Sequence, residues 1–414
     1  MVVHSTEHTV PIQQRPSISW TRSVSAFAFL AAWTIGCLMI NGSQFLFLLP
    51  LYFLPFDFTR RWYQAGIRVS KGGFGTLLVL MCQWFAPTRM HITFERHGPG
   101  AFTDEEMDNI LILDRNKNVV GLNLPQKSVL IANHQAYPDW WYAWCLAYFA
   151  GMHRDVLIVL KKNLKYIPVL GWGMQFFQFI FLARSWASDR VYLVNELARV
   201  ARSAEKADTP LTFILYPEGT LVSPNTRPAS KRYAEKLGIP DMTHMLLPRS
   251  TGLLYSLRAL SPRIPSLHLI DITMAYPGIP PQGNGQEYYT LRSVFLAGTA
   301  PPAIHMHIRR YPVSSIPIGS VSAPTSGVFP ELEVPPGDAQ AFELWLRELW
   351  RQKDRFMERF HARGTFAEEG KEEGAVDLPL RVRKTHEVLN AYCFFVPAIA
   401  VYAWTKVRTM IYSL

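Results

Sequence analysis

The stretch SVLIANHQAYPD, residues 128–139, reads as a short strand, a polar loop and the start of a helix. Its first five residues are mostly apolar, which is typical of a strand that is buried on both faces. Proline is favoured in the first turn of a helix, so Pro138 places the helix start there and leaves His134 in the loop. The stretch therefore predicts a strand–loop–helix unit with polar residues directly after the strand.

The same alternation continues along the chain. Further β-rich runs occur at 155–160, 179–183, 211–216, 266–276 and 303–308. Helical patterns separate them, at about 139–150, 188–206, 229–237 and 250–260. Strands that alternate with helices predict an α/β fold, in which a mostly parallel sheet is flanked by helices. Ligands bind such sheets at the carboxyl ends of the strands, so we expect the functional site at that edge.

The composition indicates contact with lipid. Of the 414 residues, 49% are hydrophobic and 18% are charged, which is below the ~25% charge of soluble domains. This balance excludes a disordered chain, and the four cysteines, which form no CxxC pair, exclude a disulfide-rich miniprotein. The net charge of +10 suits either nucleic acid or an anionic membrane surface.

Residues 23–56 are the strongest hydrophobic segment, because they contain no charged side chain. The segment exceeds the roughly 20 residues that a helix needs to span a membrane. Asn41-Gly42-Ser43, Pro50 and Pro55 interrupt it. We therefore expect a helix, a break and a second hydrophobic segment, arranged as one or two membrane passes or as a re-entrant hairpin. Two shorter uncharged segments, 72–88 and 388–405, fit a membrane segment and a buried core helix equally well.

A helix is predicted from Asp338, a candidate N-cap, to about His361. Apolar side chains recur on one of its faces, and Arg347, Lys353 and Glu358 are expected on the opposite, solvated face. Core packing is the favoured interpretation, with docking on a membrane surface as the alternative. The chain then divides into an N-terminal tail with membrane-anchoring segments (1–98), an α/β catalytic domain (99–330), an amphipathic helix with a charged linker (331–375) and a C-terminal hydrophobic membrane segment (376–414).

His134 and Asp139 form a candidate general-base pair. The loop that contains His134 can fold back onto Asp139, which lies in the first helical turn, where the helix dipole favours a carboxylate. An aspartate that binds one ring nitrogen fixes the tautomer and leaves the other nitrogen free to take a proton from a hydroxyl. No Ser or Cys nucleophile stands beside the pair in this stretch.

Further polar residues follow the neighbouring strands. The turn Tyr216-Pro217-Glu218-Gly219-Thr220 ends the fourth β-rich run, and its glycine allows a ligand to approach the backbone. Arg184 follows the third run, and Lys161-Lys162 follows the second. Such cations suit a phosphate group, although Lys161-Lys162 is equally consistent with a solvated strand end.

Together these residues resemble the membrane-bound glycerophospholipid acyltransferase family, which acylates lysophosphatidic acid and other lysophospholipids from acyl-CoA. Four motifs occur in the family's order: Asn133, His134 and Asp139; Phe179, Ile180 and Arg184; Pro217, Glu218, Gly219 and Thr220; and residues 272–277. Within the family, the segments 171–172, 184–189, 247–252 and 305–312 are similar to the lysocardiolipin and lysophosphatidylinositol acyltransferase branch. Leu221 stands where many members have an arginine, which puts one phosphate contact in doubt and disfavours lysophosphatidic acid as the acceptor.

The resemblance implies a lysophospholipid acyltransferase of phospholipid remodelling, with a lysophosphatidylinositol or lysocardiolipin-like acceptor. It implies acyl-CoA as co-substrate, with neither a metal nor a cofactor. His134 would be the general base and Asp139 would orient it. The implied acceptor-binding residues are Asn133, Arg184, Glu218, Gly219 and Thr220, with Lys161 as a weaker candidate. The implied location is an integral one in the endoplasmic reticulum membrane, with the mitochondrial membrane as the rival.

Other functions stay open: a lysophosphatidic acid acyltransferase of de novo synthesis, a CoA-independent transacylase, a hydrolase and a non-enzymatic lipid-binding protein. The hydrolase is disfavoured because the chain has no Gly-x-Ser-x-Gly elbow, and no motif supports binding of nucleic acid. His305 and His307 lack a cysteine or carboxylate cluster, so a structural role is favoured over a metal site. The sequence leaves open the head group, the acylated position, the acyl chain and the oligomeric state.

Overall fold

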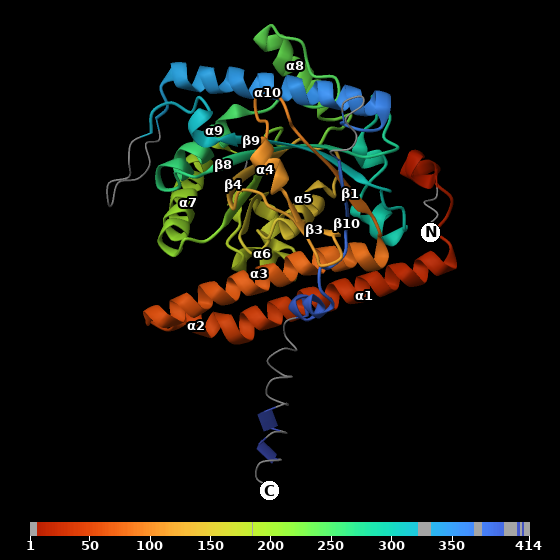
Figure 1. Ribbon diagram of the computed structural model, residues 1–414, viewed down its shortest axis with the longest axis vertical. Coiled ribbons are helices and arrows are strands. Elements are labelled where there is room, and N and C mark those ends of the chain that lie inside the picture. Colours follow the sequence, from red (N-terminus) through yellow and green to blue (C-terminus); the bar gives the residue numbers. More distant parts are fainter. Residues whose placement is uncertain are drawn as a thin grey trace.

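The computed structural model describes residues 6–183, 185–321, 333–367, 375–392, 404–405 and 408–409. An eight-stranded sheet forms its centre, with helices on both faces (Figure 1). The strand order is β10-β1-β9-β8-β4-β7-β5-β6, and the strands from β8 to β6 in this order are mutually parallel. This arrangement confirms the predicted α/β fold with a mostly parallel sheet.

All six predicted β-rich runs form strands of this sheet: β4 (Lys127–Ala132), β5 (Val156–Lys161), β6 (Ile180–Leu182), β7 (Leu211–Leu215), β8 (His268–Ala275) and β9 (Ile304–Pro312). Two further strands, β1 (Arg89–Phe94) and β10 (Val376–Pro379), pair with each other. Both lie outside residues 99–330, so the sheet extends beyond the predicted limits of the catalytic domain. A separate hairpin is formed by β2 (Leu111–Leu113) and β3 (Val119–Leu122).

Five helices lie close to their predicted positions: α5 (Asp139–Phe149), α7 (Trp186–Ala207), α8 (Arg227–Leu237), α9 (Ser250–Leu260) and α10 (Pro336–Arg363). The short helices α4 (Asp104–Asp108) and α6 (Leu170–Phe176) were not predicted, and α11 (Val388–Ala391) lies at the start of the predicted C-terminal segment. Figure 1 shows α10 on one side of the sheet, with the long helices α1 and α3 on the other. Since α5 packs against α3, and α10 packs against β8 and α9, the sheet is covered on both faces.

The N-terminal hydrophobic segment forms a helical hairpin. The first arm runs without a break through α1 (Trp20–Ser43), a π-helical turn (Gln44–Leu48) and α2 (Leu49–Phe53), and α3 (Asp57–Phe85) returns beside it. The break predicted at Asn41-Gly42-Ser43 is therefore wrong. The Asn41 amide nitrogen donates to the carbonyl of Cys37 inside the helix, at 3.0 Å, and to that of Val169, at 2.9 Å, so local and tertiary contacts bind the donor of a side chain that was expected to disrupt the helix.

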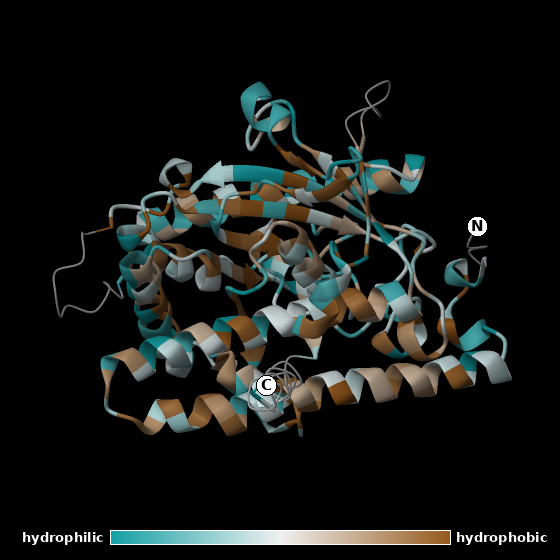
Figure 2. Ribbon diagram, turned by 60° about the horizontal axis from the view of Figure 1, so that its bottom comes forward, coloured by the Kyte–Doolittle hydropathy of each residue, from teal (hydrophilic) through white to brown (hydrophobic). Residues whose placement is uncertain are grey.

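Both arms are long and apolar enough to cross a membrane. The first, Trp20–Phe53, has 34 residues, and 22% of its most apolar window is buried. Figure 2 shows this arm at the edge of the molecule, with apolar residues along most of its length. The second, Asp57–Phe85, is 78% buried over its window, because it packs against the α/β part. Of the two interpretations of residues 72–88, the structure supports the core helix. The predicted C-terminal segment, 388–405, lies mostly outside the described residues.

Helix α10 packs its apolar face into the core, which confirms the favoured interpretation of the amphipathic pattern. The helix begins at Pro336, two residues before the predicted N-cap Asp338, which instead lies in the first turn. The prediction that Lys353 is solvated is wrong: its side chain has no exposed surface. Its Nζ lies 2.5 Å from Oδ1 of Asp271 and 2.6 Å from the carbonyl of Ile272, and this pairing makes burial of the charge possible.

Candidate active site

His134 and Asp139 meet at the carboxyl end of β4. His134 lies in the loop after the strand, and α5 begins at Asp139, with Pro138 as its N-cap. The Nδ1 atom of His134 lies 2.8 Å from Oδ2 of Asp139, whose side chain is fully buried. The imidazole itself keeps 20% of its surface exposed. The structure therefore brings together the two residues that the sequence paired, with one ring nitrogen bound and the ring accessible.

Three more donors bind the carboxylate of Asp139. The backbone amides of Gln135 and Ala136 donate to Oδ2, at 2.7 and 3.0 Å, and the hydroxyl of Tyr276 donates to Oδ1, at 2.5 Å. Burial raises the pKa of Tyr276 well above its usual value, so this hydroxyl stays protonated and remains a donor. Because these donors stabilise the anionic form of Asp139, its partner Nδ1 carries the proton, and Nε2 of His134 is left as the basic nitrogen.

The ring of Tyr216 stacks on a face of the His134 imidazole. The two rings are nearly parallel, with centroids 4.5 Å apart and an angle of 27° between their planes. Tyr216 is the first residue of the turn that contains Glu218, so the same turn supplies the ring that stacks on His134. Together with the bond to Asp139, this stacking restricts the imidazole to one orientation.

Glu218 faces the interior and holds the loop of His134. Its side chain is 2% exposed, and its Oε1 accepts the backbone N–H of His134, at 3.2 Å. Its Oε2 accepts the N–H of Leu246, at 3.2 Å, and the indole of Trp350 on α10 lies 3.4 Å from Oε1. Burial raises the pKa of Glu218 to about 7. These contacts connect β7, the catalytic loop and α10.

A buried ionic cluster lies under α10. Asp271 on β8 accepts from both Arg309, on β9, and Lys353, with shortest distances of 2.7 and 2.5 Å. The side chains of all three residues are 0–1% exposed. Burial lowers the pKa of Lys353 to about 8, and the negative charge of Asp271 opposes this shift. The sequence pattern placed Lys353 in solvent because helical spacing alone does not reveal a partner on a distant strand.

The other predicted site residues lie at various distances from this centre. Asn133 is fully buried, and its amide binds both backbone groups of Met274 on β8, at 2.9 and 2.7 Å. Gly219 takes the left-handed conformation, with φ +71°, and Thr220 follows it half-buried. Lys161 is exposed at the end of β5, separated from β4 by β7. Arg184 lies outside the described residues.

Arg249 is a candidate site residue that motif matching did not single out. Its backbone N–H donates to the carbonyl of Pro217, at 2.8 Å, and its side chain lies over Gly219. The side chain is exposed, and in the described part of the chain no ion pair or hydrogen bond of its guanidinium is found. The only sequence signal was its place in the segment 247–252, which carried the resemblance to one branch of the family.

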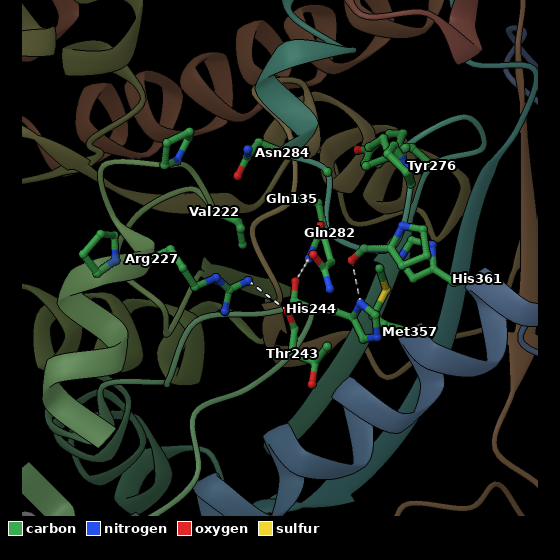
Figure 3. Close-up of a pocket in the computed structure, with 16 residues that line it drawn as sticks. Gln135, Val222, Arg227, Thr243, His244, Tyr276, Gln282, Asn284, Met357 and His361 are labelled. Carbon is green, nitrogen blue, oxygen red and sulfur yellow. Dashed lines mark hydrogen bonds between the residues drawn. The ribbon is translucent and has the colours of Figure 1, made fainter. Parts of the chain in front are cut away.

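Two cavities border the catalytic loop and α5. An apolar cavity of about 490 Å³ lies between α1 and α5, and Trp140 and Trp141, which directly follow Asp139, line it. A second cavity, the polar cavity, of about 390 Å³ is lined by Gln135, Tyr276 and residues of α10 (Figure 3). An apolar and a polar cavity therefore lie next to residues that directly flank the catalytic pair, Trp140 and Gln135 respectively.

Comparison with known proteins identifies the family. The acyltransferase family matches residues 116–274, and the family of acyltransferase C-termini matches residues 329–389. The 2-acyl-1-lysophosphatidylinositol acyltransferase of Saccharomyces cerevisiae is 34% identical, over 73% of this chain and 77% of its own length. An uncharacterised acyltransferase of Schizosaccharomyces pombe is 31% identical over 89% and 93% of the two chains. Lysocardiolipin acyltransferase 1 of Danio rerio is 35% identical over 57% and 53%.

The match to the yeast acyltransferase spans 73% of this chain, and the first family match includes the catalytic loop, so the similarity extends well beyond the short motifs. The described geometry agrees with it, since the histidine and aspartate of the first motif are in contact. This chain therefore belongs to the acyltransferase family and is an acyltransferase.

Proposed function

We propose that the protein transfers a fatty acyl group from acyl-CoA to the free glycerol hydroxyl of a lysophospholipid. The observation that carries the proposal is the His134–Asp139 pair, whose free ring nitrogen is accessible and has no Ser or Cys nucleophile in contact with it among the described residues. Such a pair activates an acceptor hydroxyl directly. The yeast and fish relatives, named for lysophosphatidylinositol and lysocardiolipin, support a lysophospholipid as that acceptor.

In the proposed mechanism, Nε2 of His134 takes the proton of the acceptor hydroxyl as its oxygen attacks the thioester carbonyl. The new ester bond forms, the carbon–sulfur bond breaks, and CoA leaves as a thiolate that accepts the proton from the imidazolium. Asp139 stabilises that imidazolium through the bond to Nδ1. General-base catalysis contributes about 10²–10⁴-fold, and positioning of the two substrates contributes much of the rest.

The apolar cavity is suited to the acyl chain. It is lined by Phe29 and Trp33 of α1, Phe74 of α3 and Trp141 of α5, which lies two residues after Asp139. Because α1 also exposes apolar side chains, including Phe27 at 74%, the same hairpin would dock on the bilayer that contains the substrates. We place the enzyme at the endoplasmic reticulum membrane, with the mitochondrial membrane as the alternative.

Arg249 is suited to the phosphate of the acceptor. Its exposed guanidinium lies beside the turn that holds the loop of His134, and it has no partner in the described part of the chain. Arg249 would supply the positive charge that is missing at position 221, where this chain has Leu221 and many members of the family have an arginine. Glu218 is turned inward, so we assign it to positioning the catalytic loop rather than to direct contact with the acceptor.

Replacing Arg249 with Gln is expected to raise KM for the lysophospholipid about tenfold or more, with little change in kcat. A hydrogen bond to a charged group contributes about 1.5–3 kcal/mol, and Arg249→Lys should restore part of the loss as a point charge. Steady-state kinetics at saturating acyl-CoA measure the effect, and Arg232→Gln, at an exposed position on α8, is the matched control. An unchanged KM would remove Arg249 from the site.

The proposed function itself is tested by offering the purified protein a panel of lysophospholipids with several acyl-CoAs. We expect a diacyl product, detected by mass spectrometry, whose formation requires both substrates. Product formed from phospholipid without acyl-CoA would show transacylation instead. Release of free fatty acid without an acceptor would show hydrolysis, and either result would overturn the assignment.

A further inference from the structure

The polar cavity is lined by residues from separate elements that converge on one space. Gln135 enters from the catalytic loop, His244 from the segment before α9, Gln282 and Asn284 from the loop after β8, and His361 from α10 (Figure 3). With a volume of about 390 Å³, the cavity is within the range of small-molecule sites. None of these side chains has a part in the proton transfer proposed above.

The cavity shares its wall with the catalytic loop. Gln135 directly follows His134, and its Nε2 donates to the carbonyl of His244, at 3.0 Å. Val222, which also lines the cavity, donates its N–H to the carbonyl of His134, at 3.2 Å. Gly285 packs so closely on Gln135 that an added Cβ would lie 2.1 Å from its carbonyl oxygen. A ligand in this cavity would therefore contact Gln135, the residue that directly follows the proposed base His134 in the sequence.

The lining can form hydrogen bonds and carries little net charge. The Nδ1 of His244 donates to the carbonyl of Pro281, at 2.9 Å, which leaves its Nε2 as an acceptor. Burial and the neighbouring His244 lower the pKa of His361 to about 4, so its ring is neutral at pH 7 and offers one donor and one acceptor. The two imidazole centroids are 4.8 Å apart. The side chains of Gln282, Asn284 and Thr243 add neutral polar groups.

Arg227 is the one cation among the residues that line the cavity, and its charge is engaged elsewhere. Its guanidinium donates to the carbonyls of Met242, Thr243 and Met245, at 2.9, 3.2 and 2.5 Å, and lies 3.9 Å from a carboxylate oxygen of Asp241. No acidic side chain lines the cavity in the described residues. The cavity thus has neither free cations for several phosphates nor carboxylates for an ammonium group.

We infer that the polar cavity binds an uncharged, polyhydroxylated head group of the acceptor lysophospholipid, such as inositol. This inference rests on the proposed function and deepens it. Hydroxyl groups both donate and accept, as the neutral imidazoles and amides require, while Met357 and Ile279 offer apolar surface to the C–H face of the ring. The phosphate-rich end of CoA lacks matching cations here.

The test uses two substitutions that remove polar atoms and keep a similar shape. His361→Phe retains the ring that packs against His244 and Phe360, and Thr243→Val retains the branched side chain. Each variant of the full-length enzyme is assayed in mixed micelles with one acyl-CoA and two acceptors, lysophosphatidylinositol and lysophosphatidic acid. The second acceptor has the phosphate but no head group, so it does not enter the cavity. His268→Phe, at the amino end of β8, is the matched control.

The unsubstituted enzyme is expected to prefer lysophosphatidylinositol. Each substitution should lower kcat/KM for that acceptor about fivefold, because a net hydrogen bond contributes about 1 kcal/mol, and the double variant should lose more than either single variant. The value for lysophosphatidic acid should stay within about twofold of the unsubstituted enzyme.

Three results would overturn the inference. An unchanged ratio of the two acceptors would show that the cavity does not contact the head group. An equal loss for both acceptors would show a structural effect of the substitutions on the loop. An unsubstituted enzyme that acylates other lysophospholipids but shows no preference for the inositol head group would exclude the inferred ligand. Failure to acylate any lysophospholipid would instead contradict the proposed function.

Discussion

Replacing His134 with Ala is expected to lower acyl transfer by at least about 10²–10⁴-fold, the contribution of a general base. The physical reason is that Nε2 is the basic nitrogen of the pair, while Nδ1 is committed to Asp139, at 2.8 Å. Steady-state assays of the purified variant with acyl-CoA and lysophospholipid measure the loss. Binding of either substrate should be nearly unaffected, because the alanine removes no group proposed to hold them.

Asp139→Asn is the informative companion of this variant. An asparagine can turn its amide toward the imidazole, which would protonate Nε2 and remove the base without removing the ring. We therefore expect a similar loss in kcat for both variants, and less than the sum of the two in the double variant, because the residues act as a unit. His268→Ala, at the opposite end of β8, is the matched control. If the His134 variant transfers acyl groups at nearly the unsubstituted rate, His134 is not the general base.

Replacing Asp271 with Asn is expected to destabilise the folded protein by about 3–5 kcal/mol, the usual cost of breaking a buried ionic cluster on one side. The substitution leaves the charges of Arg309 and Lys353 without their common partner, and both side chains are at most 1% exposed. Urea or thermal unfolding of the detergent-solubilised protein measures the change. The rate of acyl transfer should fall as well, because α10 contacts Glu218, which holds the catalytic loop, through the indole of Trp350, at 3.4 Å.

Glu348→Gln provides the control on the same helix. Glu348 is 50% exposed and pairs with Arg355, which is 63% exposed, at 3.3 Å. Exposed pairs contribute at most about 1 kcal/mol, so this variant should unfold close to the unsubstituted protein. Equal stability of the two variants would contradict a structural role for the Asp271 cluster.

The local patterns of the sequence were sufficient for the strands that surround the site. Each of the central strands is a short apolar run, and burial on both faces of a parallel sheet makes that run visible without an alignment. The strands β1 and β10, which pair at one end of the sheet, were not recognised. They pair across 290 residues of chain (Arg89 with Pro379), which local periodicity does not show.

The catalytic pair was predictable for a local reason as well. His134 and Asp139 are five residues apart, and Pro138 between them ends the loop and starts the helix, so their contact depends on chain geometry within one turn. Tyr276, which also binds Asp139, is 137 residues away, and Glu218 is 84 residues from the backbone amide that it accepts. These partners needed the sheet to bring the ends of β4, β7 and β8 together.

The sequence by itself thus determined the strand–loop–helix units, the edge of the sheet that carries the site and the identity of the catalytic pair, because each depends on neighbours in the chain. Only the tertiary structure decided which polar residues are buried. The charge of Lys353 is paired with Asp271, 82 residues away. The side chain of Asn41 is held within the helix by a hydrogen bond to the carbonyl of Val169, 128 residues away. The cavities, too, are formed by walls from distant segments. Burial and charge pairing are properties of those long-range contacts, which is why the helical pattern of α10 and the composition of the triplet at 41–43 predicted the opposite.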